Sequence, residues 1–366
     1  MKQNRKLLSK RYSREYMCHL KIPTNVQYTL RELEKEIERT PNYRIPFNHC
    51  QICGCKEATI VSEMSRFSLP MESQVCDFCG LVYTVGHFSL EFMHRYYKYY
   101  FYRIRRPGSK KKKFIGHIKP GSNAWARQHF VKQHIGKKYN DVKIVAEIGC
   151  GDGGNLYPYY CDNKRAIGCD FNEEAMQKGK EIGLELYNGD VSCLIKKGIK
   201  ADLIILPHVL AHISDLNEFL GKISKLINPG GYLYVESDGI FSSSSNGEQK
   251  HNNLLRYFQF DFNFCFELRT LSYLLEKNGF TMEYGNESIK SIFTLQINND
   301  YFIDSFAQIP KNNGEVLKKM ERMEHNYLNQ GILIRKLRGF INLIKNTAIY
   351  QIFDILIFLR YKKNYL

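Results

Sequence analysis

Residues 123 to 285 alternate between short apolar runs and helix-like stretches, and this alternation constrains the fold more than any other feature of the sequence. The helix-like stretches include WARQHFVKQHIGKKY and LNEFLGKISKLI, and the apolar runs are KIVAEIG, RAIGCDFN, LELYNGD, ADLIILPHVL and YLYVES. Strands that alternate with helices form a parallel sheet whose connections are crossover helices. We therefore expect an α/β fold built on a parallel sheet in this part of the chain.

A glycine-rich turn, EIGCGDGG at residues 147 to 154, follows the first predicted strand and opens a helix-like stretch. Glycines there let the backbone approach a ligand closely. Gly149, Gly151 and Gly154 match the G-x-G-x-x-G pattern of dinucleotide-binding proteins, and Asp170 follows at a distance suited to a ribose contact. A nicotinamide dinucleotide is therefore one candidate ligand.

The acids around this turn favour a different ligand. Glu147 stands two residues before the first glycine, where a dinucleotide would place its negative pyrophosphate, and the repulsion would cost energy in a partly desolvated site. S-adenosylmethionine (SAM) instead presents a positive amino group and a positive sulfonium. Asp170 and Asp190 follow the second and third predicted strands, so acids after three strands fit a cationic nucleoside better than a diphosphate. The alternative is that all three are solvated loop acids.

Four segments in order resemble the class I SAM-dependent methyltransferases, over about residues 125 to 282. VAEIGCGDGGN is similar to their first motif, IGCDFN to their ribose-binding strand end, NGDV to their adenine-side acid, and INPGGYLYVE to the entry of their fifth strand. The resemblance implies a Rossmann-like sheet with SAM as the cofactor. It also implies roles for individual residues: methionine-end contacts by Glu147, Gly149 and Gly151, ribose binding by Asp170, and adenine contacts by Asp190 and Val191.

Two Cys-x-x-Cys pairs precede this region, Cys50 with Cys53 and Cys76 with Cys79. Each pair can place two thiolates on one metal ion, and together they complete a tetrahedral four-thiolate site for zinc. A glycine follows each pair, which eases the tight turn of a zinc knuckle. Four thiolates leave no open coordination position, so we expect a structural metal. Four unrelated cysteines are the alternative.

The segment around these cysteines resembles a group of bacterial enzymes of surface-polysaccharide and sugar biosynthesis, in which a zinc ribbon precedes the methyltransferase sheet. The similarity is carried by CDFCGLVYT and by the tyrosine-rich MHRYYKYYFY. VLAHISDLNEFL further resembles the sugar C-methyltransferases, which implies that His212 lies at the active site. The implied substrate is a sugar or glycan on a nucleotide, a lipid carrier or a polysaccharide, and we expect it to bear phosphate.

The two histidines of LPHVLAH are the candidate catalytic residues. His208 and His212 follow the fourth predicted strand, at the carboxyl edge where open α/β sheets bind ligands. They are four residues apart, so on a helical turn they would share a face. Methyl transfer to a hydroxyl or carbon needs a base that titrates near the working pH, and histidine is the usual choice. His212 is the preferred candidate for the base, and His208 is the second candidate. The alternative is that each is a hydrogen-bonded histidine with a structural role.

The formal net charge is +16, and residues 92 to 140 hold 14 Lys and Arg residues with no Asp or Glu. Such a stretch attracts anions, whether the phosphates of a nucleotide-linked substrate, anionic lipid or nucleic acid. A zinc-containing RNA methyltransferase is therefore the alternative function. Nucleic acid is the less favoured partner, because LPHV replaces the Asn-Pro-Pro-Tyr motif of exocyclic-amine methylases. A non-catalytic scaffold with a methyltransferase fold is a third interpretation.

These patterns divide the chain into five regions. They are a basic N-terminal extension (1–48), a zinc ribbon (49–84), a Tyr-rich helix with Ser89 as N-cap followed by a basic loop (85–122), a SAM-binding domain (123–285) and a helical C-terminal region (286–366). The C-terminal helix mixes apolar residues with Lys and Arg, so it either lies on an anionic membrane or packs on the outer face of the sheet. The Ser-rich loop 241–250 is a candidate lid or an inert insertion.

The N-terminal stretch MKQNRKLLSK carries positive charge but lacks the apolar segment of a secretory signal. The longest apolar run near the C-terminus, IFDILIFL, is too short to span a bilayer. The chain has 11 cysteines, which suit a reducing compartment where metal ligands are expected rather than disulfides. We expect a cytoplasmic protein, with peripheral membrane contact through the C-terminal helix as an option.

Overall fold

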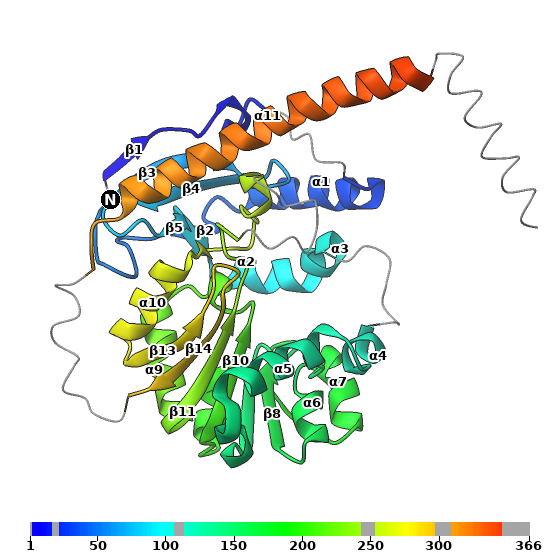
Figure 1. Ribbon diagram of the computed structural model, residues 1–366, viewed down its shortest axis with the longest axis vertical. Coiled ribbons are helices and arrows are strands. Elements are labelled where there is room, and N and C mark those ends of the chain that lie inside the picture. Colours follow the sequence, from blue (N-terminus) through cyan, green and yellow to red (C-terminus); the bar gives the residue numbers. More distant parts are fainter. Residues whose placement is uncertain (1, 17–21, 106–112, 243–252, 297–308, 346–366) are drawn as a thin grey trace, which may run out of the picture.

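The chain folds into two lobes, and the computed structural model describes residues 2–16, 22–105, 113–242, 253–296 and 309–345 (Figure 1). One lobe holds a seven-stranded main sheet, and the other, which we call the front lobe, holds a five-stranded sheet. Three expectations fall largely outside the described residues. They are the densest part of the basic loop (106–112), the Ser-rich loop (243–252) and the end of the C-terminal region (346–366).

The main sheet contains the five expected strands in the order β9-β8-β7-β10-β11, all parallel. Their bounds are β7 Ile144–Ile148, β8 Arg165–Asp170, β9 Glu185–Asn188, β10 Ala201–Pro207 and β11 Ile227–Glu236. Two antiparallel strands, β14 (Lys290–Leu295) and β13 (Phe280–Gly285), continue the sheet beyond β11. The expected boundary after residue 285 is therefore wrong, because it divides the β13–β14 hairpin and removes a strand that pairs with β11.

Alternate residues of the central strands enter two hydrophobic clusters, one on each face of the main sheet. Leu203 and Ile205 pack with one set of helices, whereas Ile204 and Leu206 pack with the other. The first set is α5 (Asn123–Ile135), α6 (Tyr157–Cys161) and α7 (Glu173–Glu181), and the second is α8 (Val191–Lys196), α9 (Leu216–Leu226) and α10 (Leu268–Lys277). This arrangement is the three-layer architecture that the alternation predicts.

The front lobe is assembled from segments that lie far apart in the sequence. Its sheet has the order β1-β3-β4-β5-β12, with bounds β1 Lys2–Arg5, β3 Glu57–Met64, β4 Pro70–Cys76, β5 Val82–Thr84 and β12 Phe264–Cys265. A two-stranded pair, β2 (Arg44–Pro46) with β6 (Gly86–Phe88), and helix α1 (Thr24–Arg39) complete this part. Because β12 follows the main-sheet strand β11 in the sequence, the chain returns to the front lobe after building most of the other lobe.

The tyrosine-rich segment is helical, as expected, but its middle turn is widened. Ser89 caps α2 (Leu90–Arg95) by accepting a hydrogen bond from the Phe92 amide at 3.3 Å. A π-helical segment (Tyr96–Phe101) follows and leads into α3 (Tyr102–Arg105). Tyr96 is buried in the front lobe, whereas the side chains of Tyr99 and Tyr102 are exposed. The short helix α4 (Lys113–Ile118) then leads toward α5.

Helix α11 (Asn313–Lys345) runs along the front lobe (Figure 1). Val316 and Met320 are buried in the hydrophobic cluster of that lobe. Glu324 is also buried, and it accepts hydrogen bonds from Arg11 at 2.7 Å and from the Tyr12 hydroxyl at 2.7 Å. The described side chains of α11, which reach residue 329, thus pack on the front lobe. The apolar and basic stretch from residue 334, which was expected on a membrane or on the outer face of the main sheet, lies beyond them. Within the described ranges, no helix is long and apolar enough to cross a membrane.

Candidate functional site

The glycine turn lies at the carboxyl end of β7, in the middle of the main sheet. Gly149 and Gly151 have φ angles of 70° and 56°, which favour glycine because a Cβ would be strained there. A Cβ built on Gly151 would meet nothing within 4 Å, so there is open space beside this residue. The Gly151 amide donates a hydrogen bond to Asp170 Oδ2 at 2.8 Å, which ties the turn to the end of β8.

Glu147 is fully buried beneath this turn. Its Oε1 accepts a hydrogen bond from Asn155 Nδ2 at 2.7 Å, but its Oε2 has no hydrogen-bond partner among the described residues. Burial raises the pKa of this carboxyl well above its usual range. An ammonium group brought by a ligand would partner the orphaned oxygen and offset the cost of desolvation. The amino group of SAM therefore fits this site, and a pyrophosphate does not.

Asp170 and Asp190 follow β8 and β9, but they differ in their contacts. Asp170 Oδ1 accepts from the Asn172 amide at 2.7 Å, so each of its oxygens holds a backbone amide and still has a lone pair for a ligand hydroxyl. Asp190 is exposed and caps α8 by accepting from the Ser192 amide at 3.1 Å. Val191 beside it is buried. Their contacts to ribose and adenine stay predictions.

A chain of polar contacts that the sequence did not predict runs from Glu147 to His208. Asn155 Oδ1 accepts from Arg127 Nη1 at 2.9 Å, and Arg127 Nε donates to Glu236 Oε2 at 2.6 Å. Glu236 Oε1 lies 3.6 Å from His208 Nε2. Burial would raise the pKa of Glu236, but hydrogen bonds from His208 and Arg127 hold it well below its ordinary value. The cofactor turn and the fourth-strand histidine are thus physically connected.

His212 lies where the two lobes meet, at the end of the short helix η4 (Leu210–His212). Its Nδ1 is 2.9 Å from the Asp261 carbonyl oxygen and 3.0 Å from the hydroxyl of Tyr97 on the front lobe. Because a carbonyl only accepts, we assign the proton to Nδ1, which leaves Nε2 as the basic nitrogen. Burial lowers the pKa of His212, so the imidazole is neutral at neutral pH.

His208 does not share a helical face with His212, and that expectation is wrong. His208 has a φ of 60°, and its amide donates to the Glu236 carbonyl at 2.7 Å, so the chain kinks before η4 begins. Each histidine has its own carboxylate: Glu236 lies beside His208, and Asp261 Oδ2 lies 3.6 Å from His212 Nδ1. We keep His212 as the candidate base because it also contacts Tyr97.

The tyrosine-rich helix brings the front lobe over the same edge of the main sheet. Asn172 Nδ2 donates to the Tyr102 hydroxyl at 3.4 Å, and the ring centroids of His94 and Phe171 are 6.3 Å apart. Phe171 is 64% exposed although it is a large apolar residue. Aromatic surfaces of both lobes therefore flank the position where Asp170 ends β8. This partnership could not be read from sequence, because it joins residues of separate lobes.

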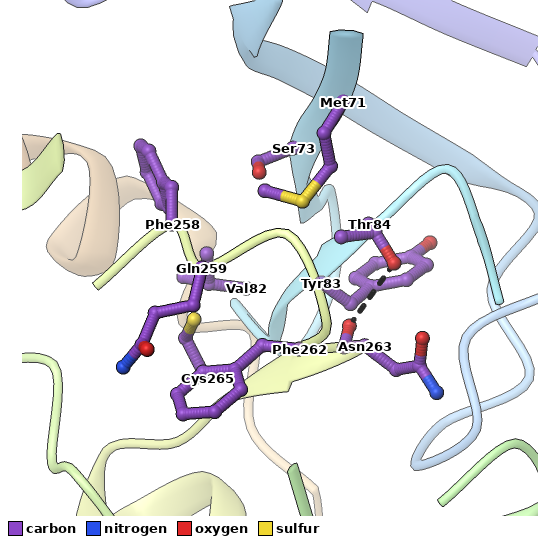
Figure 2. Close-up of a pocket in the computed structure, with 10 residues that line it drawn as sticks. All are labelled: Met71, Ser73, Val82, Tyr83, Thr84, Phe258, Gln259, Phe262, Asn263 and Cys265. Carbon is purple, nitrogen blue, oxygen red and sulfur yellow. Dashed lines mark hydrogen bonds between the residues drawn. The ribbon is translucent and has the colours of Figure 1, made fainter. Parts of the chain in front are cut away.

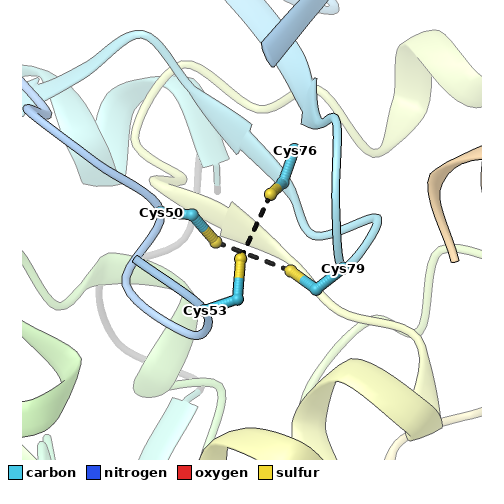
Figure 3. A group of neighbouring side chains, drawn as sticks. All are labelled: Cys50, Cys53, Cys76 and Cys79. Atoms are coloured by element: carbon cyan, nitrogen blue, oxygen red, sulfur yellow. Dashed lines mark hydrogen bonds between the residues drawn. The ribbon is translucent and has the colours of Figure 1, made fainter. Parts of the chain in front are cut away.

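The four predicted metal ligands meet in one cluster (Figure 3). The Sγ atoms of Cys50, Cys53, Cys76 and Cys79 all lie within 4.8 Å of one another, with 3.6 Å between Cys50 and Cys79 and 3.4 Å between Cys53 and Cys76. Sulfurs around a tetrahedral zinc ion with bonds of about 2.3 Å are about 3.8 Å apart. The donor set therefore fits a closed, structural four-thiolate site, and zinc itself stays a prediction.

The first cysteine turn is also fastened to helices of the main sheet. The Gln51 carbonyl accepts from Asn217 Nδ2 of α9 at 2.9 Å, and the Ile52 carbonyl accepts from Lys277 Nζ of α10 at 3.1 Å. The cysteines of the cluster share a hydrophobic cluster with α9 and α10. The cysteine turns thus lie between the lobes, and the Lys277 ammonium is placed to offset the negative charge of a four-thiolate site.

A small pocket lies inside the front lobe, between β4, β5 and the segment that leads into β12 (Figure 2). Its wall is mainly apolar and includes Met71, Val82 and Phe262. No residue expected to bind SAM, metal or the acceptor proton lines it. We therefore attribute this pocket to imperfect packing between β12 and its neighbours.

Residues 116–284 match the model of a family described as a methyltransferase domain. This stretch contains the glycine turn, the strand-end acids and both candidate histidines. Together with the parallel order of the main sheet, the match identifies residues 116–284 as a methyltransferase domain with a Rossmann-like α/β sheet.

Two relatives and one solved structure are similar to this part of the chain. The ubiquinone biosynthesis O-methyltransferase of Brucella anthropi is 26% identical over 124 residues, 30% of this chain and 50% of the relative. The protein of the same name from Chelativorans sp. is 28% identical over 105 residues, 27% of this chain and 41% of the relative. The chain thus spans half or less of these relatives. A SAM-dependent methyltransferase of Methanosarcina mazei is similar in structure, with a TM-score of 0.33, 16% identity, and coverage of 43% of this chain and 93% of that one.

We expect Glu147→Gln to weaken SAM binding about tenfold or more, because the amide places an N–H where the carboxylate would accept from the SAM ammonium. Isothermal titration of SAM into both proteins measures the change. Glu173→Gln, at an exposed position in α7, is the control and should leave the affinity unchanged. Equal affinities for wild type and Glu147→Gln would remove the assignment of this carboxylate to the methionine end.

We expect Cys76→Ser to lose the bound zinc and to lower the melting temperature, because a serine hydroxyl is a poor zinc ligand and the cluster holds two lobes together. Metal content by mass spectrometry and thermal unfolding measure both effects. Cys161→Ser, at an exposed cysteine outside the cluster, serves as the control. A Cys76→Ser variant that keeps one zinc per chain would contradict the four-thiolate site.

Proposed function

We propose that the protein transfers a methyl group from SAM to a phosphate-bearing sugar or glycan, with His212 as the general base and zinc as a structural metal. The observation that carries the proposal is the position of His212. It lies at the carboxyl edge of the main sheet, contacts Tyr97 of the front lobe and presents Nε2 as its basic nitrogen. The resemblance of CDFCGLVYT and the tyrosine-rich helix to sugar-modifying enzymes supports the acceptor class, and the exposed rings of Phe171 and Tyr102 suit a sugar face.

When bound, SAM supplies a methyl group on a positive sulfur, and an acceptor oxygen or carbon displaces it in line while the C–S bond pair stays on sulfur. Glu147 would hold the amino group through its orphaned oxygen, and Asp170 would accept from the ribose hydroxyls. His212 would take the acceptor proton on Nε2. Asp261 and Tyr97 hold the imidazole in the required orientation through Nδ1.

RNA methylation is the alternative function. The basic stretch of the sequence favours it, but the contacts of those basic residues in the front lobe support it less. Arg95, Arg103 and Arg105 belong to the basic stretch of residues 92 to 140, but each pairs with an acid. Their N–O distances are 3.0 Å to Glu36, 2.6 Å to Glu32 and 3.0 Å to Asp261. Less of this charge is therefore available to a phosphate backbone, which favours a small phosphorylated acceptor.

Incubation with methyl-labelled SAM and fractionated extract from cells that lack the protein tests this proposal. We expect label in the nucleotide-sugar or lipid-linked glycan fraction, and the labelled product then reveals which atom carries the methyl group. Boiled protein is the control for transfer by enzymes of the extract. Label in RNA would overturn the glycan assignment and support the alternative.

We expect His212→Ala to lower turnover by about 10²-fold or more while SAM affinity is retained, since a general base acts on the acceptor and not on the cofactor. Steady-state rates on the labelled acceptor, with SAM binding measured in parallel, test this. His325→Ala, at an exposed position on α11, is the control. Full activity of His212→Ala would make this histidine structural.

The pH profile gives a second check on His212. The base must be neutral to act, and burial lowers its pKa below 6.5, so protonation occurs only at more acidic pH. We expect turnover to be constant through neutral pH and to fall as the pH drops below the lowered pKa. A rate that already falls above pH 6.5 would contradict the assignment.

A further inference from the structure

Helix α4 (Lys113–Ile118) lies against the glycine turn, although the sequence predicts only a basic loop before residue 123. His117 Nδ1 is 3.1 Å from Asp152 Oδ1 and 3.0 Å from Asp152 Oδ2. Because a carboxylate only accepts hydrogen bonds, we assign a proton to Nδ1, which donates to Asp152. A Cβ built on Gly154 would lie only 2.6 Å from His117 Cβ, so the third glycine of the G-x-G-x-x-G pattern leaves room for α4.

The glycine turn needs support from outside its own backbone. Four of the residues 149 to 154 are glycines, which lose more conformational freedom on ordering than any other residue. Asp152 is the one charged residue among these six, and its Oδ1 also accepts a hydrogen bond from the Gly154 amide at 3.0 Å. Asp152 directly follows Gly151, beside which there is open space for a ligand. A group that fixes the Asp152 carboxylate therefore restrains the part of the turn that borders this space.

The position of α4 depends on a few side-chain contacts. The helix has six residues, too few to be stable by itself. Ser122 Oγ donates to the His117 carbonyl, and Trp125 Nε1 donates to the Ile118 carbonyl at 2.9 Å. These two contacts attach the end of α4 to the start of α5, and the contact between His117 and Asp152 attaches the same end to the glycine turn. His117 thus lies where α4, α5 and the turn meet.

We propose that His117 is a positioning residue for the cofactor: by donating to Asp152, it holds the glycine turn in the conformation that binds SAM and keeps α4 beside the cofactor. This inference rests on the SAM binding of the proposed function, but not on the sugar or glycan acceptor. His117 acts through Asp152 and not on the reacting atoms, so its loss is expected to change the cofactor affinity. The His117 side chain is 41% exposed, and water competes for such a pair, which limits the expected loss to a moderate factor.

Isothermal titration of S-adenosylhomocysteine into the full-length protein tests this role. We expect His117→Ala to weaken binding roughly three- to tenfold and His117→Asn to restore most of the affinity, because the asparagine Nδ2 can donate from nearly the same place as Nδ1. In an Asp152→Ala background, His117→Ala should cause little further loss, as expected for two residues that act through one contact. His129→Ala, at an exposed position of α5, is the matched control.

Trp125 gives a direct measure of how α4 is held, because it is the only tryptophan of the chain and its indole contacts the end of this helix. We expect acrylamide to quench Trp125 fluorescence more strongly in His117→Ala than in the wild type, since the released helix uncovers the indole. His117→Asn and His129→Ala should be quenched like the wild type. Equal quenching of His117→Ala and the wild type would contradict the attachment of α4 by this contact.

Melting temperatures are measured for every variant, and Asp152→Ala replaces His117→Ala as the test if the latter does not fold. Unchanged S-adenosylhomocysteine affinity would overturn the positioning role. An equal loss in His117→Ala and His117→Asn, or an additive loss in the double variant, would also overturn it, because His117 would then not act through its hydrogen bond to Asp152. A folded wild type that binds no S-adenosylhomocysteine would instead overturn the proposed function.

Discussion

The contact between the first cysteine turn and the helices of the main sheet fixes where the active site can be. Asn217 and Lys277 hold the carbonyls of Gln51 and Ile52, and the surrounding side chains form one hydrophobic cluster that spans both lobes. His212 lies on one lobe and its hydroxyl partner Tyr97 on the other. They stay within hydrogen-bond distance only if the two lobes keep a fixed relative position. The cysteine cluster therefore helps to keep His212 and its partner Tyr97 in a fixed relation.

Two buried glutamates, at the ends of strands that flank β10 on either side, show how partners decide the state of a carboxyl group. Glu236 ends β11 and receives two hydrogen bonds from Arg127, so it stays ionised. Glu147 ends β7, on the other side of β10, and receives one hydrogen bond from the Asn155 side-chain amide, while its Oε2 has no partner among the described residues. The first carboxylate is satisfied by the protein, and the second has an oxygen that the proposed SAM amino group would partner. Arg127 donates hydrogen bonds to Glu236 and none to Glu147, and this difference separates the structural role of Glu236 from the binding role proposed for Glu147.

The main sheet and the glycine turn could be predicted because each depends on a local pattern. Every parallel strand is an apolar run bounded by turn residues, and the cysteine cluster follows from spacing alone. The partners of His212 could not be predicted, since Tyr97 lies 115 residues away in sequence and Asp261 lies 49 residues away. Arg127 and Glu236 are 109 residues apart, and although Glu236 ends the INPGGYLYVE segment, nothing in the sequence pairs it with Arg127. β14 was missed because KSIFTL is short and lies between polar segments.

The order in which the front lobe is completed has a consequence for biosynthesis. Strand β1 is synthesised at the beginning of the chain. The edge strand β12 follows β11, and helix α11 comes near the end of the described chain. The buried pair of Arg11 and Glu324 joins positions 313 residues apart. On the ribosome the methyltransferase sheet can therefore form before the lobe that precedes it in sequence is complete. The buried contacts of β3 and β4 with α11 can form only after α11, near the end of the described chain, has been synthesised.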